Sequence, residues 1–588
     1  MKQTEGNRNF VKRMFYRFLI PSLATSFFLS LSNIVDSLVI GQRMQESGLA
    51  AVSLTLPIFM VYNVLDIALS TGGAMTYAQM LGVGNAKKAR AHFTQTAALS
   101  LLLSLPFVLL GLAGTPLVAW ILGAAPEQGE VYRYTLDYAQ ILLLAAPLFF
   151  LNFVFYEFIR VDDGEVRASV GFIAGTVADF TLNFVFVLGL GLGVRGAILA
   201  TVAGQLISIL IYLGHFLHPG HVLQFCRGAL QKKELLQSFR LGFAGSSRYI
   251  LQFIFLLSAN QILIRNHGAL GVAVFDLLLN VNYVAFSLFD GSLSTMQPLV
   301  TTFIGEHHFD AAKSTLKRAL VWGSALTAGL LAVIGVFAPQ ICCAFGVTEA
   351  AANHEGTAAV RIFLIGVLFA GWNTLYAGFA QASGHERLTF LMFLLRNLAV
   401  LLPCMFVFSL FGRLSVIWWM YPAAEIISMA VWMLAIKKTN SSFLDQTEDT
   451  HILRTGLGND PKEIGSVIQA VEGFCEKWEA SMKQSYYVTL TVEEICSAII
   501  LNAFDKQNRI AEENYIQLTL VAKENGDFEL HLRDNAKSFN PFDMVTKQIL
   551  NADSTEGLES IGILMVKQKA KQFFYRRYLG FNVLVITV

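Results

Sequence analysis

The stretch LDIALSTGGAMTYAQMLGVGNAKKA, residues 65–89, has a counterpart in FDGSLSTMQPLVTTFIGEHHFDAAK, residues 289–313. Alignment of the two places Asp66 on Asp290, and a Ser-Thr pair follows each aspartate at the same distance. Internal repeats are typical of secondary transporters, whose substrate site lies between the two halves. The alternative is a chance likeness of two amphipathic loops, because short motifs also match by accident. We therefore predict two related halves.

The composition indicates that most of this chain lies in lipid. Of its 588 residues, 54% are hydrophobic and 14% are charged, with a mean hydropathy of +0.54, whereas soluble domains are about a quarter charged. The net charge of +1 provides no basic excess for phosphates, so we expect no nucleic-acid partner. The six cysteines lack the paired spacing of a zinc site or a disulfide framework. The sequence predicts an integral membrane protein.

Apolar runs long enough to cross a bilayer recur up to residue 436. A spanning helix needs about 20 mostly apolar residues. Loops rich in Lys and Arg alternate with loops poor in them, which predicts a multi-pass protein of the plasma membrane with both termini in the cytoplasm. The twelve predicted spans are 15–41, 49–74, 93–114, 132–159, 168–190, 195–217, 239–264, 271–299, 316–340, 357–381, 388–411 and 414–436.

The fold class that follows is an α-helical membrane protein of two six-helix repeats, with a small cytoplasmic α+β domain after them. The predicted organisation is a cytoplasmic N-terminus (1–14), an N-terminal bundle (15–217), a cytoplasmic loop (218–238), a C-terminal bundle (239–436), a linker (437–454) and a soluble domain (455–588). In the soluble domain, periodicity predicts helices over 461–484, 492–504 and 562–572 and strands over 515–524, 527–534, 573–578 and 581–588.

Polar residues inside the apolar runs are the candidate functional groups. Asp36 lies in the middle of the first run, where a carboxylate costs about 3 kcal/mol or more. Asp179 and Asn183 share one helix face because they are four residues apart, and Thr201 opens the next run. Such oxygens suit either a sodium ion or a proton on a desolvated carboxyl, although Asp179 could instead be hydrated near a helix end. Asn260 stands at the repeat position of Asp36, so the titrating site belongs to the first half.

Residues 15–436 resemble the multidrug and toxic compound extrusion (MATE) transporters. The likeness rests on motifs in a characteristic order, namely IVDSLVIGQRMQESGLAAVSLTLPI, AQMLGVGNAKKA, IRVDDG, GLGVRGAILATV, FAQASGHERL and YPAAEII. The resemblance implies antiport of bulky amphipathic organic cations against H⁺ or Na⁺, with no cofactor for transport.

The resemblance also implies roles for individual residues. Asp36 would be the coupling group, helped by Asp179, Asn183 and Thr201, with any Na⁺ near Asp36 and Asp179. The order of Asp179 and Asn183 is the reverse of that in the family, so which oxygen faces the ion is open. Asn152 on the fourth helix is a further candidate ligand.

From about residue 470 the chain resembles the ATP-binding domain of GHKL ATPases, in particular serine kinases that act as anti-sigma factors. Glu494 matches the base carboxylate and Asp534 the aspartate that accepts from the adenine amino group. Phe539 and Asn540 fit the following loop, and Gly562 fits the phosphate loop.

Three family positions are altered in this domain. Ala498 replaces the magnesium-binding asparagine, and Ala536 and Ser560 stand where glycines are usual. Phosphoryl transfer depends on a held metal ion, so we expect kinase activity to be lost. The domain is predicted to sense ATP or ADP, or to dock a regulatory protein.

The function predicted from the sequence is secondary active efflux of organic cations rather than an enzymatic reaction. Two alternatives stay open: a membrane sensor with a kinase-like output, and a flippase for lipid-linked oligosaccharides. A sensor would need an intact nucleotide site. A flippase would be expected to line its cavity with several basic residues for pyrophosphate.

Overall fold

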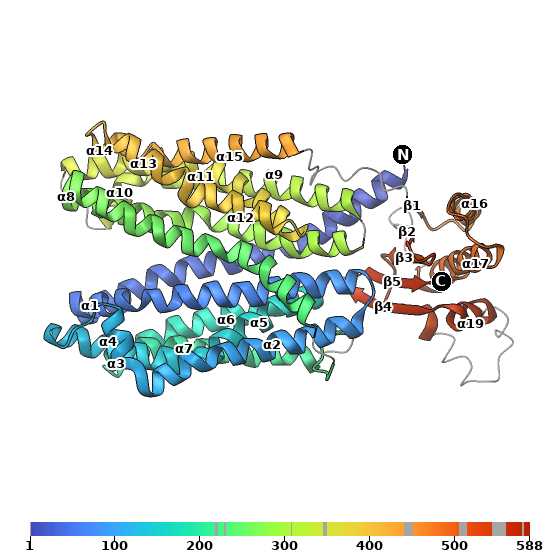
Figure 1. Ribbon diagram of the computed structural model, residues 1–588, viewed down its shortest axis with the longest axis horizontal. Coiled ribbons are helices and arrows are strands. Elements are labelled where there is room, and N and C mark those ends of the chain that lie inside the picture. The colour runs from blue at the N-terminus through green and yellow to red at the C-terminus, as the bar shows by residue number, and fades with distance from the viewer. Residues whose placement is uncertain are drawn as a thin grey trace.

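The computed structural model describes residues 2–217, 221–228, 231–306, 308–344, 350–439, 451–504, 514–543, 560–578 and 581–588. Helices form two lobes that lie side by side, the first coloured blue to cyan and the second green to orange in Figure 1. The residues from 451 onward, called the C-terminal domain below, lie at one end of both lobes (Figure 1). We call that end of the lobes the domain-proximal end.

The N-terminal lobe is built on a helix that reverses direction. Ser22 contacts Glu165 and Tyr77 contacts Asp162, yet a straight helix from residue 22 to 77 would span about 80 Å. The polar residues 42–48, predicted as a loop, are assigned to this helix. The elements are α1 (Lys2–Gly82), α2 (Ala86–Leu109), η1 (Leu110–Gly114), α3 (Thr115–Ile121), η2 (Pro126–Gln128), α4 (Glu130–Leu144), α5 (Ala146–Ile159), η3 (Arg160–Gly164), α6 (Glu165–Asn183), η4 (Phe184–Gly189), α7 (Gly193–Leu213) and η5 (Gly214–Leu217).

The C-terminal lobe repeats this design. Gln381 contacts both Leu241 and Gln297 of its first helix, which must therefore also turn back. Its elements are α8 (Lys232–Gly305), α9 (Phe309–Val336), α10 (Ala338–Ala344), α11 (Ala350–Ala382), α12 (Glu386–Leu394), η6 (Leu395–Ala399), α13 (Leu401–Ser409), α14 (Leu414–Ile417) and α15 (Met420–Thr439).

Nine helices within the described ranges are long and apolar enough to cross a membrane. Helices suit this environment because they satisfy their backbone polar groups internally. The number twelve stays a prediction, since α1 and α8 each take up two predicted spans and the candidate span Ala146–Gly189 overlaps two more.

The two lobes meet along α1 and α8 at glycines that occupy corresponding positions in the two repeat copies. A Cβ atom added to Gly82 would lie 2.9 Å from the Cα of Gly305. No side chain fits between these backbones, so glycine is required for the approach. The repeat thus places its two copies against each other at the domain-proximal end.

The C-terminal domain is a five-stranded antiparallel sheet with strand order β1-β2-β3-β5-β4. Four strands lie where the sequence predicts them, but β1 falls partly inside the predicted linker. The elements are β1 (Ile452–Leu457), α16 (Glu463–Lys477), α17 (Met482–Ala498), η7 (Ile499–Ala503), β2 (Ile516–Ala522), β3 (Phe528–Asp534), α19 (Ser560–Lys569), β4 (Gln572–Tyr578) and β5 (Phe581–Thr587).

Two predicted helices of this domain were wrong in extent, and the one predicted over 492–504 already begins at Met482. The prediction over 461–484 joined two helices that the structure separates, since α16 ends at Lys477 and Glu479 has a φ of 54°. Ser481 then begins α17 with a capping box, in which its side chain accepts from the backbone of Gln484. That reciprocal cap satisfies free amides of the new helix and so fixes its start.

Both faces of the sheet are buried, and they differ in chemistry. One face carries apolar residues such as Leu518 and Leu532 that pack against α16, α17 and α19. Alternation in a strand sends successive side chains to opposite faces, and the other face is mixed. Its buried polar members are Gln517, Thr519, Glu529, His531, Arg533 and Arg576, and its buried apolar members include Val521, Phe581, Val583 and Val585.

Candidate functional site

Two predicted coupling residues contact each other in the N-terminal lobe. Asp179 and Asn183 lie near the end of α6, and both are buried. The Asn183 Nδ2 donates a hydrogen bond to the Asp179 Oδ1 at 3.0 Å. The one-turn spacing therefore places both polar groups on one side of α6, as the sequence indicates.

Helices α5 and α7 bring the other predicted ligands to the same region. A Cβ atom added to Gly204 of α7 would lie 3.0 Å from the Cβ of Asp179, and Thr201 is about one turn away on the same helix. The Thr201 Oγ1 donates to the carbonyl of Ala197 at 3.3 Å. The Asn152 Nδ2 of α5 donates to a carbonyl of α7 at 3.1 Å. Their role in ion coupling stays a prediction.

The central predicted coupling residue, Asp36, belongs to α1. Its side chain lies outside the described residues, as does that of Asn260. In the parts of the chain that the structure does describe, no group of three His, Cys, Asp or Glu side chains is arranged to hold a metal ion. The oxygens near Asp179 fit a proton, or a sodium ion if Asp36 joins them, because sodium takes oxygen ligands of this kind.

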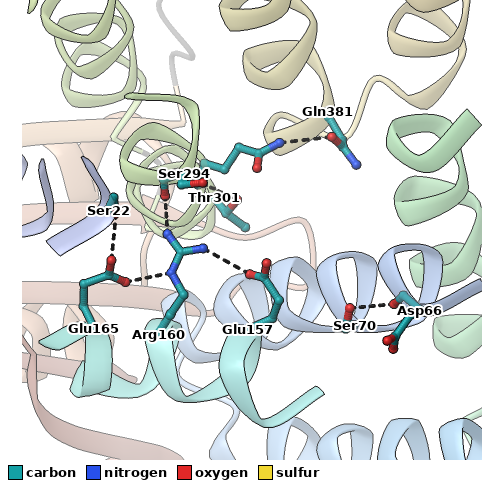
Figure 2. Close-up of polar contacts among 10 residues, drawn as sticks. Ser22, Asp66, Ser70, Glu157, Arg160, Glu165, Ser294, Thr301 and Gln381 are labelled. Carbon is teal, nitrogen blue, oxygen red and sulfur yellow. Dashed lines mark hydrogen bonds and ion pairs between the residues drawn. The ribbon is translucent and has the colours of Figure 1, made fainter. Parts of the chain in front are cut away.

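A buried arginine that the sequence reasoning missed joins the two lobes. The Arg160 Nε donates to the Glu165 Oε2 at 2.8 Å, and its Nη1 lies 3.4 Å from Glu157. Its Nη2 donates to the backbone carbonyl of Ser294, which belongs to α8 of the other lobe. The Ser22 hydroxyl of α1 donates to the second oxygen of Glu165 at 2.8 Å. Figure 2 shows these groups converging on the guanidinium.

The sequence did contain a signal for this arginine. Acids flank it in EFIRVDDGE, with Glu157 before it and Asp162, Asp163 and Glu165 after it. Charged residues in or next to membrane spans are usually paired. The loop that carries it is fixed by Asp162, which accepts from the Tyr77 hydroxyl at 2.9 Å and from the backbone amide of Leu223 at 2.9 Å. His215 lies 3.0 Å from the same carboxylate.

The aspartates aligned by the repeat have different surroundings. Asp66 is buried, and its Oδ1 has no hydrogen-bond partner among the described residues. Figure 2 places Asp66 on the far side of Glu157 from Arg160. Asp290 lies within electrostatic reach of Arg248 and Arg396. The repeat therefore aligns the two aspartates in sequence, but the charged groups around them differ.

Other acids of the second half are paired locally. Glu425 accepts from the Arg396 Nε at 2.9 Å and from the Asn373 Nδ2 at 2.7 Å. Asp276 is exposed and interacts with Asn280 one turn later. Both acids are therefore held by neighbours within the second half.

The C-terminal domain contains a buried carboxylate at the predicted adenine position. The Asp534 Oδ1 accepts from the Asn582 Nδ2 at 2.7 Å and from the Ala536 amide at 2.9 Å. Burial raises the pKa of Asp534 to about 7, although these hydrogen bonds and Arg577 oppose the rise. Phe539 follows on the adjoining loop, where its amide lies 3.5 Å from the Asn582 Oδ1.

The predicted phosphate-loop glycine and base carboxylate also lie close together. A Cβ atom added to Gly562 of α19 would lie 2.0 Å from the Cδ of Glu494, so this carboxylate packs on the glycine backbone. Partial burial raises the pKa of Glu494, with a further contribution from Glu493. Asn540 caps its own turn by accepting from the amide of Phe542. The Ser560 side chain lies outside the described residues.

Comparisons with known proteins address the membrane lobes. The MatE family model matches residues 21–188 and 247–407. The "Multidrug export protein MepA" of Staphylococcus saprophyticus is 23% identical over 435 residues, covering 73% of this chain and 95% of the relative. MepA of Staphylococcus haemolyticus is 25% identical, with coverages of 73% and 94%.

Solved structures show the same fold in these lobes. A MOP superfamily transporter from Pyrococcus furiosus matches with a TM-score of 0.69 at 21% identity, over 76% of this chain and 99% of that one. The MATE multidrug transporter DinF-BH in complex with R6G matches with a TM-score of 0.66 at 22% identity, over 74% and 97%. The family match ends at residue 407, so the GHKL likeness of the C-terminal domain stays a prediction.

Proposed function

Because this chain belongs to the MatE family of transporters, we propose that it exports small amphipathic organic cations in exchange for H⁺ or Na⁺. The coupling proposal depends on one observation, the buried hydrogen bond of 3.0 Å between the Asn183 Nδ2 and the Asp179 Oδ1. Both residues are on α6, which packs against the helix of Thr201. Buried carboxylates in membrane helices are rarely without a function. Asp36 would complete the site from α1.

Ion binding at this site would bias the two lobes between their open states. A ligand shifts such an equilibrium only by its differential affinity for the two states. Alternating access by rocking of two repeats requires the contact between Arg160 and the Ser294 carbonyl to break and reform. We place the domain-proximal end in the cytoplasm, following the distribution of basic loops.

The C-terminal domain regulates transport in this proposal and does not energise it. The buried Asp534 supports binding of an adenine nucleotide, while Ala498 removes the magnesium ligand needed for phosphoryl transfer. The buried arginines of the lobes argue against a pyrophosphate-binding flippase, since Arg160 and Arg396 are each neutralised by a glutamate.

Uptake into proteoliposomes under separately imposed proton and sodium gradients tests the transport proposal. We expect one gradient to drive accumulation of a fluorescent organic cation, and Asp36→Asn to abolish it with normal protein yield. Asp137→Asn is the matched control, because Asp137 forms a partly exposed ion pair with Arg195. Transport that survives Asp36→Asn at the wild-type rate would contradict the coupling role.

A further inference from the structure

We propose that the C-terminal domain is a reversible clamp that holds the two lobes together at the domain-proximal end. The partner surface is the pair of repeat-related loops, α1–α2 in the first lobe and α8–α9 in the second. This inference rests on the proposed transport function only for its consequence, since the docked surface itself is defined by contacts within the chain.

The clamp engages the C-terminal lobe through a buried ion cluster. Glu306, directly after α8, is 1% exposed, and it pairs with Arg533 of β3 and with Arg576 of β4. His308, at the start of α9, lies 2.8 Å from the hydroxyl of Thr519 on β2. These three side chains of the domain belong to the face of its sheet opposite its helices.

The same face of the sheet engages the N-terminal lobe. The Gln572 Nε2 of β4 donates to the carbonyl of Gly84 at 3.3 Å. Gly84 has a φ of 77°, and a Cβ atom added there would lie 3.0 Å from the Cβ of Val585 on β5. Phe574 packs against the core of this lobe, and Phe581 is buried among α1 and α8. One rigid sheet therefore contacts both lobes.

The position of these contacts explains why they would restrain transport. The two loops occupy corresponding places in the repeat, and Gly82 lies against Gly305 directly before them. Rocking of the repeats must separate these loops when the protein opens on this side. A sheet bonded to both loops opposes that separation, so at least one set of contacts has to release.

The chemistry of the buried face indicates that release is feasible. In an antiparallel sheet with one face packed on its own helices, polar residues on the second face are typical of a face that can meet water. Here Gln517, Thr519, His531 and Arg533 on that second face are buried, and these side chains can be hydrated when the domain detaches. The valines and phenylalanines of the same face favour docking, so the two states compete, whereas the helical face stays covered in both.

Thiol labelling in the full-length protein tests the clamp without depending on transport. In a background without native cysteines, Thr519→Cys reports the docked face, since Thr519 is 0% exposed, and Met482→Cys reports open solvent at 93% exposure. We expect an impermeant maleimide, applied to inside-out vesicles, to label the cysteine at 519 at least about tenfold more slowly.

Variants of the ion cluster should open the clamp. Arg533→Gln with Arg576→Gln should bring labelling at 519 close to the rate at 482 and raise efflux severalfold. Lys477→Gln with Lys483→Gln is the matched control, because it removes the same charge from exposed sites on the helical side. Glu306→Gln should reproduce the effect from the transporter side and leaves the domain itself unaltered.

The outcomes separate the two proposals. Equal labelling at 519 and 482 in the otherwise unaltered chain overturns the clamp, as does continued protection of 519 in both cluster variants. Absence of ion-driven transport in every variant overturns the proposed function, while the labelling still decides whether the domain is docked.

Discussion

Arg533 and Asp534 are consecutive residues of β3 whose side chains leave opposite faces of the sheet. Arg533 pairs with Glu306 of the membrane lobes, and Asp534 is hydrogen-bonded to Asn582 on the helical side. The candidate nucleotide-binding aspartate and the docked surface are thus separated by a single strand. A ligand that moves β3 at Asp534 would act directly on the ion cluster.

The raised pKa of Asp534 predicts that the stability of this domain depends on pH. Its pKa is about 7 in the folded state against about 4 when unfolded, so between these values only the folded state keeps the proton. The free energy of unfolding should therefore fall as pH rises from about 4 to 7, by about 4 kcal/mol in total, and level off above. Hydrogen exchange of β3 and β5 in the full-length protein, corrected for intrinsic rates, measures it.

Asp534→Asn supplies the control for this pH dependence. An asparagine oxygen can accept the same bonds from Asn582 and Ala536, but the side chain does not titrate. Protection of β3 and β5 should then be nearly independent of pH over this range. An unchanged slope in the variant would show that another group is responsible.

The order of Asp179 and Asn183 gives a second prediction. Asp179→Asn alone should abolish ion-driven uptake because it removes the carboxylate from the α6–α7 contact. The exchange Asp179→Asn with Asn183→Asp restores the family order and the same set of groups, so part of the uptake should return. Uptake rates in proteoliposomes at equal protein density compare the three proteins, and equal loss in both variants would contradict this account.

Local patterns in the sequence were enough to locate much of the fold. Apolar runs identified the membrane helices, and the alternation in IQLTLVA and FELHLRD identified β2 and β3. The four-residue spacing placed Asp179 and Asn183 on one side of α6. Each of these depends only on residues close together in the chain, where periodicity is informative.

The long-range contacts were beyond this reasoning. Alternation predicts that Thr519 and Arg533 face water, and nothing near them in the chain indicates that they dock on Glu306 and His308. The reversals of α1 and α8 were predicted as breaks between the spans 15–41 and 49–74 and between 239–264 and 271–299, but the helix assignment that runs through both breaks was not. Docking of one domain on another is decided by surface complementarity, which single-sequence periodicity does not report.

Loss of Arg160 from its buried ion pair is expected to destabilise the protein much more than loss of an arginine from an exposed pair. Arg160→Gln leaves Glu165, which is 2% exposed, without its cation, and should cost about 3–5 kcal/mol. Arg195→Gln is the comparison, since the Arg195 side chain is 60% exposed in its pair with Asp137, and should cost at most about 1 kcal/mol. Unfolding of the purified protein, followed by the loss of monodisperse protein on heating, measures both.

Removal of both buried partners sharpens that comparison. Arg160→Gln combined with Glu165→Gln should be less destabilising than Arg160→Gln alone, because no unpaired charge is left behind. Additive losses would mean that the two side chains are not coupled in stability.

The last prediction concerns Gly84. Its comparison with Gly123, a glycine of similar conformation, distinguishes the effect of backbone strain from the effect of lost docking. Gly84 and Gly123 both have positive φ, 77° and 89°, so leucine at either position pays a similar backbone penalty of about 1 kcal/mol. Only at Gly84 would the new side chain meet Val585, because nothing lies within 4 Å of a Cβ atom at Gly123. Gly84→Leu should therefore speed maleimide labelling of a cysteine at 519, and Gly123→Leu should leave that rate unchanged. Equal rates in the two variants would place the N-terminal lobe outside the docked surface and restrict the contact to the C-terminal lobe.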